Sequence, residues 1–584
     1  MKTLLKPLLE KVIADWQRNG KIPADLNIPI QIERTRDSKF GDFSSNIALL
    51  LAKPCQQKPM DIAQALVQEI EQSIAVEKIT IAAPGFINIQ MTESAYHSVI
   101  QEIMHEAQHY GRLSIGQHQR IHVEFISSNP TGPLHVGHGR HAAFGASLCN
   151  ILEMAGYQVD REYYVNDAGR QMRILAVSIW MRYLSLFDPA IAFPRRGYQG
   201  DYVTQMAHIL KEQHKDHFLH PTFSIMAELP DDNADNEESY VDGLIERAEL
   251  LLGKLGFHEI FTLGLNTILA DMKQDLAEFG VQFDQWFHES ELLNDGALTR
   301  GIQLLQTGGF LYQKDGATWF KATDFGDEKD RVVIRENGQP TYFASDVAYH
   351  LNKFERGYDQ MLDIFGSDHH GYIPRINAFI QALGKDVKKL HVLLVQFAIL
   401  YRGNIRASMS TRGGDFVTLR QLRQEVGNDV ARFFYIMRKR EQHLDFDLEL
   451  AKSQSNDNPV YYIQYAHARI CSVFRQLEQK KWVWDLADAE RCLACLNSSH
   501  EKSVMRCLSR YPEVIELAAQ IYEPSVMANY LQELAHEFHA YYNATIFLVP
   551  EAEIRNPRLY LISAIRQVLA NGLKLVGVSA PEMM

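Results

Sequence analysis

Cysteine is scarce in this chain, with six residues in 584, and their spacing does not form a disulfide framework. Disulfides form in oxidising compartments, and none is expected in this chain, so a reducing environment is expected. The first residues, MKTLLKPLLEKVIADW, alternate apolar and charged side chains with helical spacing. They lack the uninterrupted apolar stretch and the small-residue cleavage site of a secretory signal. The sequence therefore predicts a cytoplasmic protein.

Long apolar runs and an excess of positive charge are also missing. No stretch approaches the roughly 20 apolar residues of a membrane helix, so no membrane association is expected. Lys and Arg number 59 against 72 Asp and Glu, which gives a net charge of −13. This balance argues against a protein that coats nucleic acid indiscriminately, and DNA is not an expected partner. Local patches can still bind RNA.

One group of cysteines approaches the spacing of a zinc knuckle. Cys492, Cys495, His500 and Cys507 give C-x2-C-x4-H-x6-C. The segment lacks the glycines and turn residues that a knuckle usually needs, and Cys492 and Cys495 are one helical turn apart. Two core positions of a helix explain this spacing better. No metal site is therefore predicted.

The pattern of apolar residues divides the chain into three parts. Residues 1–112 combine helical stretches with the strand-like run KITIAAPGFINIQ, which predicts a small α+β domain. Residues 118–425 alternate strands and helices, interrupted at about 180–265 by a helical insertion with a mobile acidic loop. From 426 to 584 only helical periodicity is found, which predicts an all-α helical bundle. The predicted fold is multidomain, with an α/β Rossmann-type parallel sheet in its middle part.

The middle part opens with the pattern of a βαβ unit. IHVEFI indicates a buried strand, SSNPTGP a loop, and HVGHGRHAAFGASLCNILEMAGY a helix. His135 and His138 lie three residues apart, so both rings face one side of the start of this helix. A helix N-terminus attracts anions, and Gly137 lets a base or a phosphate approach the backbone. Four residues alone are weak evidence, and their place at a strand–loop–helix junction is what gives them weight.

Longer segments resemble a known family. SSNPTGPLHVGHGR is similar to the "HIGH" region of class I aminoacyl-tRNA synthetases, and NPTGP before HVGH is especially like the arginyl-tRNA synthetases. FGDFSSN and PGFINI resemble that family's N-terminal extension, which touches the tRNA D-loop. YYVNDAGRQ, YFASD and GSDHHGY follow in the expected order, and DNPVYYIQYAHARI resembles the anticodon-binding domain. The resemblance covers nearly the whole chain and implies ATP-dependent ligation of L-arginine to tRNA(Arg) through an arginyl-adenylate.

The resemblance implies roles for individual residues. His135 and His138 would stabilise phosphates in the transition state. The residues expected at ATP are Pro133, His135, Gly137, His138, His369, Met409 and Ser410. The residues expected at arginine are Ser127, Asn129, His138, Tyr342, Asp346 and Asp368. The residues expected at tRNA are Phe86, Asn88, Tyr461, Tyr465 and Arg469.

Three of these assignments have an alternative. A guanidinium is a planar cation that needs an acceptor, and the resemblance pairs Tyr342 with Asp346 in that role. Asp346 could instead cap a helix that starts at Val347. Asp368 and His369, with the next histidine, could bind a metal as in one phosphoesterase family, but the other aspartates of that family are not found in order. Phe86 and Asn88 share one face of a strand and could stack on a loop base, or Phe86 could be a core residue. The substrate and tRNA roles are favoured.

The second class I motif departs from the family pattern. Relatives commonly carry Lys-Met-Ser-Lys, whereas residues 408–411 here are Ser-Met-Ser-Thr. Some arginine enzymes compensate with a lysine before the first motif, but that position is Gly132. A hydroxyl supplies no positive charge. Arg412 is therefore predicted to be the catalytic cation that faces pyrophosphate, with Arg406 as the next candidate.

Two other functions are considered beside the ligase. Another class I H-x-G-H enzyme or a small nucleotidyltransferase would share the first motif, but the N-terminal extension and the helical tail count against a small transferase. A catalytically silent RNA-binding relative would explain the missing lysines, but intact His135, His138, Asn129 and Asp346 count against it. The expected partners are tRNA(Arg), L-arginine and ATP with Mg²⁺ as substrate. We expect a monomer without a tightly bound cofactor, and the resemblance implies that activation of arginine requires tRNA.

Overall fold

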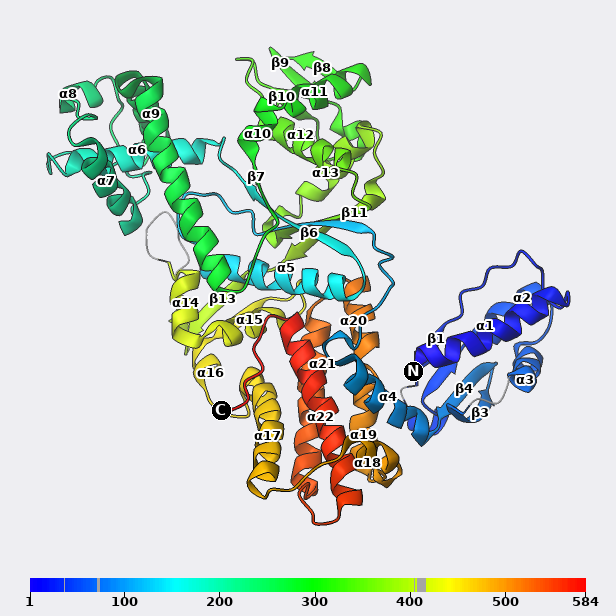
Figure 1. Ribbon diagram of the computed structural model, residues 1–584. Coiled ribbons are helices and arrows are strands. Elements are labelled where there is room, and N and C mark those ends of the chain that lie inside the picture. Colours follow the sequence, from blue (N-terminus) through cyan, green and yellow to red (C-terminus); the bar gives the residue numbers. More distant parts are fainter. Residues whose placement is uncertain (36, 71–73, 404, 407–415) are drawn as a thin grey trace.

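A five-stranded parallel sheet lies at the centre of the computed structural model, which describes the chain except residues 36, 71–73, 404 and 407–415 (Figure 1). The strands are β5 (Arg120–Phe125), β6 (Gln158–Val165), β7 (Gln285–His288), β11 (Gln360–Gly366) and β12 (Leu390–Val395). Their order is β12-β11-β5-β6-β7, and all neighbours are parallel. The chain passes from β5 to β6 on one side and later returns to β11 on the other. This reversal creates the crevice where parallel sheets bind ligands. The predicted Rossmann-type sheet is confirmed.

Two helices cover opposite faces of the central strand β5. Helix α5 (Val136–Met154) packs on the apolar face, where a Cβ atom on Gly145 would meet the Phe125 ring at 2.3 Å. Only a glycine allows that close approach. Helix α12 (Tyr342–Glu355) packs on the other face, which carries Glu124. Strand alternation therefore separates an apolar face from a charged one.

The insertion between β6 and β7 is helical, as expected, but its acidic stretch is more ordered than a mobile loop. The helices are α6 (Arg170–Ser185), α7 (Asp201–His214), α8 (Thr222–Ile225) and α9 (Glu237–Glu278). Helix α9 is interrupted at Gly253, where φ is 64°. At its start, Asp242 pairs with Arg170 at 2.7 Å and Glu238 with Arg196 at 3.1 Å. These ion pairs fix the acidic residues against neighbouring segments.

Two smaller sheets flank the central one. Strands β8 (Leu311–Lys314), β9 (Ala317–Phe320) and β10 (Arg331–Ile334) form an antiparallel sheet beside α10 (Glu289–Asn294), α11 (Ala297–Thr307) and α13 (Tyr372–Ala382). Strands β13 (Ala398–Arg402), β14 (Ile405–Arg406) and β15 (Leu444–Asp447) form the other. The expectation of helices only after Val426 is therefore wrong, because β15 pairs in parallel with β13. Its four residues are too few to show a strand pattern.

Helices dominate the rest of the C-terminal part. Helices α14 (Leu419–Val426), α15 (Asn428–Ile436) and α16 (Leu448–Lys452) connect it to the sheets. The bundle consists of α17 (Pro459–Gln479), α18 (Leu486–Arg491), α19 (Ser499–Leu508), α20 (Tyr511–Gln520), α21 (Ser525–Ala544) and α22 (Ala552–Leu575). The predicted helical bundle is confirmed. No helix in the described part of the chain is long and apolar enough to cross a membrane.

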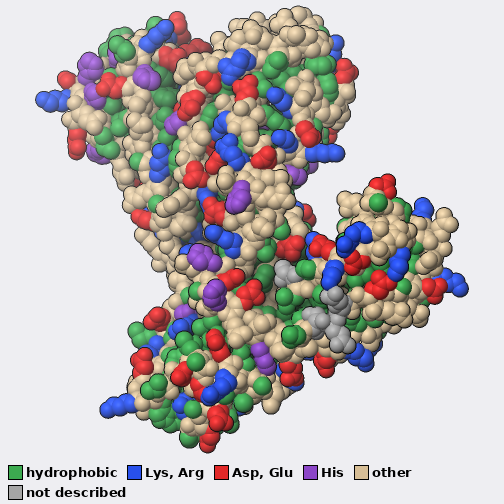
Figure 2. Space-filling model, turned by 45° about the vertical axis from the view of Figure 1, so that its right-hand side comes forward, with side chains coloured by type: hydrophobic (Ala, Val, Ile, Leu, Met, Phe, Trp, Pro, Cys, Tyr) green, Lys and Arg blue, Asp and Glu red, His purple; other side chains and the backbone are tan. Residues whose placement is uncertain are grey.

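The N-terminal part is an α+β unit, as predicted. Its antiparallel sheet has the order β1 (Ile32–Arg34), β2 (Phe43–Ser45), β4 (Phe86–Met91), β3 (Val76–Ala82). Its helices are α1 (Lys2–Arg18), α2 (Ile47–Cys55) and α3 (Pro59–Glu69), and α4 (Glu93–Glu106) joins it to the bundle. Arg34 donates to Glu513 at 2.9 Å across this junction. Figure 2 shows the unit projecting from the body, with acidic and basic side chains interspersed over the visible face.

Candidate active site

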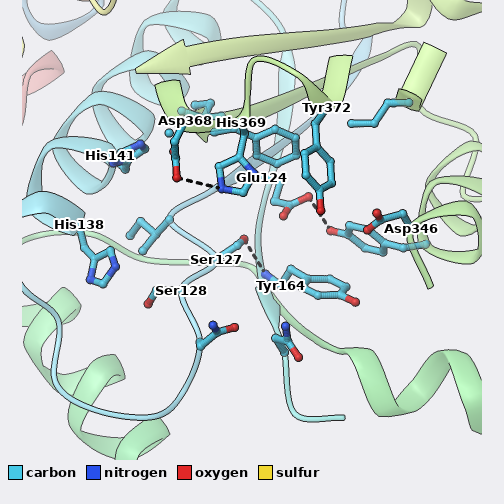
Figure 3. Close-up of a pocket in the computed structure, with 18 of the residues that line it drawn as sticks. Glu124, Ser127, Ser128, His138, His141, Tyr164, Asp346, Asp368, His369 and Tyr372 are labelled. Atoms are coloured by element: carbon cyan, nitrogen blue, oxygen red, sulfur yellow. Dashed lines mark hydrogen bonds and ion pairs between the residues drawn. The ribbon is translucent and has the colours of Figure 1, made fainter. Parts of the chain in front are cut away.

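A cavity of about 480 Å³ lies at the carboxyl ends of β5, β6 and β11 (Figure 3). Six of the residues predicted from the sequence line it: Ser127, Asn129, His138, Asp346, Asp368 and His369. A smaller cavity of about 150 Å³ adjoins it and shares Ser128, Asn129 and His138. Pro133 and His135 line the smaller one. The structure thus brings all of the residues predicted at arginine except Tyr342, and part of those predicted at ATP, to one continuous site.

The loop after β5 turns sharply to shape this site. Ile126 and Ser127 both have a left-handed backbone, with φ of 71° and 42°. Residues with side chains rarely adopt this conformation, and it is held here by tertiary contacts. The Ser127 hydroxyl accepts a hydrogen bond from the backbone N–H of Tyr164 at 3.1 Å. The turn directs Ser128 and Asn129 into the cavity.

The two histidines of HVGH cap helix α5 with their own rings. The backbone N–H of Gly137 donates to His135 Nδ1 at 3.0 Å, and the backbone N–H of His135 donates to His138 Nδ1 at 3.3 Å. The rings stack with their centroids 3.6 Å apart. This reciprocal arrangement is a capping box. It satisfies N–H groups at the helix start and fixes both rings.

These hydrogen bonds determine the form of the rings. Burial, followed by the neighbouring His141, lowers the pKa of His135 to about 4. Burial also lowers the pKa of His138 well below its usual range. Both imidazoles are therefore neutral at pH 7, and because each Nδ1 accepts a hydrogen bond, the proton lies on Nε2. They act as N–H donors and not as cations.

The start of α5 is also held by the segment that follows the second motif. The backbone N–H of Val136 donates to the Val417 carbonyl at 3.2 Å, and that of Leu419 donates to the Leu134 carbonyl at 2.8 Å. Phe416 lines the smaller cavity and meets the His135 ring edge-on at 6.3 Å between centroids. The two class I motif regions are thus joined by backbone pairing.

The opposite side of the larger cavity is acidic. Asp346 is the fifth residue of α12 and lies across the cavity from His138 (Figure 3). Burial raises the pKa of its carboxyl to about 7, an effect opposed by His350 and supported by Glu289. Among the described residues, none donates a hydrogen bond or forms an ion pair with this carboxylate. The alternative role as a helix cap is not seen, since Thr341 precedes α12 and no side chain caps it.

Sequence analysis did not assign two residues on this acidic side to the site. Glu124 near the end of β5 and Asn166 after β6 both line the cavity. The Asn166 Oδ1 atom is buried without a partner among the described residues. In the strand pattern IHVEFI, Glu124 is a single charged residue among apolar ones. That isolated charge was the available signal.

Other predicted residues lie less directly at the site. Tyr342 is 51% exposed and its hydroxyl accepts a hydrogen bond from the backbone N–H of Arg170 at 3.4 Å. It is not among the described residues that line the cavity. Gly137 lies beneath the rings, and a Cβ atom there would meet His135 at 2.8 Å. Asp368 and His369 approach each other at 3.7 Å at the cavity rim.

The residues predicted to contact tRNA lie on strand β4 and helix α17, and none of them lines the cavity. Phe86 is 37% exposed, whereas Asn88, two residues further along β4, is only 5% exposed. On α17 the rings of Tyr461 and Tyr465 stack at 5.8 Å, and the Arg469 guanidinium lies over Tyr465 at 4.9 Å. This spacing of four residues places all three on one face of the helix.

Several predictions fall elsewhere. Met409, Ser410 and Arg412 lie outside the described residues, so their placement remains a prediction. The prediction that Cys492 and Cys495 are core residues of a helix is wrong, because Cys492 ends α18 partly exposed and Cys495 is exposed. In the described part of the chain, no three His, Cys, Asp or Glu side chains are placed to hold a metal ion.

Family models match all three parts of the chain. The model "tRNA synthetases class I (R), catalytic domain" matches residues 99–188 and 193–455. The models "Arginyl tRNA synthetase N terminal domain" and "DALR anticodon binding domain" match 3–91 and 463–584. With the H-x-G-H capping box at the start of α5, this defines the catalytic part as that of a class I aminoacyl-tRNA synthetase.

Similar proteins identify the family more closely. The chain is 55% identical over 586 residues to "Arginine--tRNA ligase" of Thioalkalivibrio sulfidiphilus, and 54% identical over 587 residues to that of Coxiella burnetii, with all of each chain covered. The arginyl-tRNA synthetase structure of Thermus thermophilus superposes with a TM-score of 0.75 at 22% identity, over 99% of this chain and 100% of that one. The chain belongs to the arginyl-tRNA synthetase family.

Proposed function

We propose that this arginine–tRNA ligase binds arginine in the larger cavity, with its guanidinium at Asp346 and its carboxylate toward His138. The observation that carries this proposal is the Asp346 carboxylate, which faces the cavity without a partner among the described residues. A buried charge without a partner is costly, and a bound cation offsets that cost. The fork of a guanidinium matches a carboxylate, whereas the ammonium of lysine does not.

ATP then lies over the start of α5, with phosphates at the Nε2–H donors of His135 and His138. An oxygen of the arginine carboxylate attacks the α-phosphorus, the bond to the bridging oxygen breaks, and pyrophosphate leaves. A hydroxyl of the terminal tRNA ribose then attacks the carbonyl carbon, the bond from that carbon to the phosphate oxygen breaks, and AMP leaves while the hydroxyl proton is released to solvent. The protein positions the reactants and stabilises negative charge in the first step. Neutral fixed N–H groups and the helix N-terminus supply that stabilisation.

ATP enters as its Mg²⁺ complex in this proposal. No metal cage is found among the described residues, so the ion would be held by the phosphates of the substrate. Pyrophosphate still requires a cation from the protein. Arg412 is the proposed group, and Arg412→Lys should recover only part of the activity that Arg412→Ala loses. If Arg412→Ala changed only the KM for tRNA, Arg406 would become the candidate for the cation that faces pyrophosphate.

Two surfaces are proposed for tRNA(Arg). The exposed ring of Phe86 supports stacking on a loop base, and Tyr461, Tyr465 and Arg469 offer an aromatic and cationic face on α17. The burial of Asn88 supports a role in shaping the strand more than in reading a base. Phe86→Ala should raise the Kd for tRNA, whereas equal affinity for intact tRNA would contradict the proposal. We further propose a monomeric cytoplasmic enzyme, which sedimentation and localisation of the tagged chain would test.

Arginine-dependent ATP–pyrophosphate exchange, measured with and without tRNA(Arg), tests the proposed function. We expect exchange with arginine and tRNA together, and little with lysine or without tRNA. Exchange with another amino acid and its tRNA would contradict the substrate assignment. Binding of tRNA without exchange would favour a silent RNA-binding relative.

A further inference from the structure

Three buried carboxylates form a row beneath the arginine cavity. Asp363 on β11 lies opposite Glu124 on β5, and Glu124 lies opposite Glu162 on β6. Their exposed fractions are 0%, 4% and 1%. Like charges on neighbouring strands repel, and burial increases the cost. The row therefore needs compensating groups.

Helix α12 supplies those groups from the face that also carries Asp346. The Tyr349 hydroxyl lies 2.6 Å from Glu162 and 3.0 Å from Glu124. Lys353 donates to both Glu124 and Asp363. Arg356, at the C-terminal end of the helix, donates to Glu162 at 2.5 Å. Residues 346, 349, 353 and 356 recur at helical spacing. The helix is therefore docked on the sheet by a charged seam, and its N-terminal half carries the cavity carboxylate of Asp346.

Lys353 is the central cation of this seam. Its Nζ atom lies 2.6 Å from Glu124 Oε2 and 2.7 Å from Asp363 Oδ1, and its side chain is fully buried. Burial acts to lower the pKa of Lys353, but the two carboxylates outweigh it and raise the pKa. The other oxygen of Glu124 has no partner among the described residues, and Glu124 lines the cavity.

We propose that Lys353 is a positioning residue for arginine recognition, which holds Glu124 charged and oriented toward the guanidinium and fixes α12 so that Asp346 faces it. The inference rests on the proposed function, since it needs arginine in the larger cavity. Lys353 touches no substrate itself, because Glu124 lies between it and the cavity. A second link runs from Asp363 to His350 at 3.1 Å and from His350 Nδ1 to the Asp346 carbonyl at 2.8 Å.

The test is Lys353→Met in tRNA-dependent exchange with the full chain. The variant leaves Glu124 and Asp363 facing each other without their shared cation, so one of them takes up a proton or turns away. We expect the KM for arginine to rise roughly tenfold or more, the range of one lost charged hydrogen bond, and the KM for ATP to change less than about twofold. An unchanged arginine KM would overturn the proposal.

Arg356→Met is the matched control. It removes one cation from the same helix and the same seam, but its partner Glu162 is not among the described residues that line the cavity. We expect a lower Tm and no selective change in arginine KM. Equal rises of arginine KM in both variants would show that the seam acts only through general stability.

The double variant Lys353→Met with Asp363→Asn separates charge balance from positioning. It removes one cation and one anion, so the net charge of the seam is unchanged, but Glu124 still lacks the Lys353 donor. We expect Tm to recover and arginine KM to stay high. Recovery of both would overturn the proposal.

Two further variants complete the test. Should neither methionine variant fold, Lys353→Arg decides, because it keeps the charge and displaces the donors: a raised arginine KM supports the proposal and a normal one overturns it. Asp346→Asn in the same assay separates this inference from the proposed function. If that variant has a normal arginine KM, the arginine site itself is misplaced.

Discussion

In the proposed function, the two sides of the cavity use opposite means to recognise charge. On the nucleotide side, His135 and His138 are neutral, and each ring is fixed by a backbone hydrogen bond to Nδ1. On the arginine side, Asp346 is ionisable, and none of the described residues pairs with it. The first side is complete before its ligand arrives, whereas the second is completed by its ligand. Preorganised dipoles suit the stabilisation of a transition state, whereas a charge left unpaired until the ligand binds suits the selection of a substrate.

Replacement of His138 should produce the largest effect. His138→Ala removes a fixed N–H donor from the phosphates and also the acceptor of the His135 backbone N–H. Loss of one such donor typically costs about 2.7–4 kcal/mol in the transition state, or roughly 10²–10³ in rate. Single-turnover adenylate formation measures this loss, with tRNA affinity as the control. Normal adenylate formation would contradict this prediction, because the neutral side would then contribute nothing to stabilisation of the transition state.

Asp346→Asn should have the next largest effect, on the other side. The amide keeps an acceptor but loses the charge that faces the guanidinium, and hydrogen bonds to charged groups contribute about 1.5–3 kcal/mol. We expect the arginine KM to rise roughly tenfold or more, with ATP KM nearly unchanged and lysine still rejected. Steady-state exchange at varied arginine and varied ATP checks both. A shift of ATP KM alone would reverse the roles of the two sides.

The two sides should also differ in their pH dependence. Burial raises the pKa of Asp346 to about 7, so below pH 7 this carboxyl is protonated and cannot pair with a cation. Arginine KM should therefore rise as pH falls from 8 to 6. The pKa of His135, lowered to about 4, keeps that ring neutral over the same range. The slope of arginine KM should vanish in Asp346→Asn, and a slope that persists there would assign the titration to another group.

Tyr342→Phe should have the smallest effect. The resemblance pairs Tyr342 with Asp346, but the Tyr342 hydroxyl is engaged by the Arg170 backbone and half of the side chain is exposed. Loss of one exposed neutral hydrogen bond should raise arginine KM by about threefold at most. A tenfold rise would show that Tyr342 closes over bound arginine, and that the acidic side rearranges when its ligand enters.

The local parts of this site could be predicted from the sequence. The strand, loop and helix around HVGH lie within about 30 consecutive residues, and their periodicity and breakers determine where His135 and His138 stand. Asp346 could be assigned to arginine only through the resemblance of the local segment YFASD to the family, because its place in a helix by itself also suggested a cap. The prediction of each of these residues rests on the residues next to it in the sequence.

The remaining parts depend on partners far along the chain. Glu124 and Asp363 are 239 positions apart and meet only because β5 and β11 pair in one register. Lys353 has the sequence context of an ordinary exposed helix residue, and only tertiary packing buries it. The strand β15 is recognisable only beside β13. Periodicity within a short window contains no information on such pairings.

The backbone pairing of Leu134 and Val136 with residues 417–419 has a consequence for synthesis of the protein. The HVGH segment emerges from the ribosome long before its partner strand segment does. The nucleotide side of the cavity therefore cannot close until Leu419 has been made. A fragment that ends before Val417 contains every residue of the first motif and yet lacks the support that holds its helix start in place. Nascent chains should accordingly gain protection by ATP only after this point, as a late step of co-translational folding.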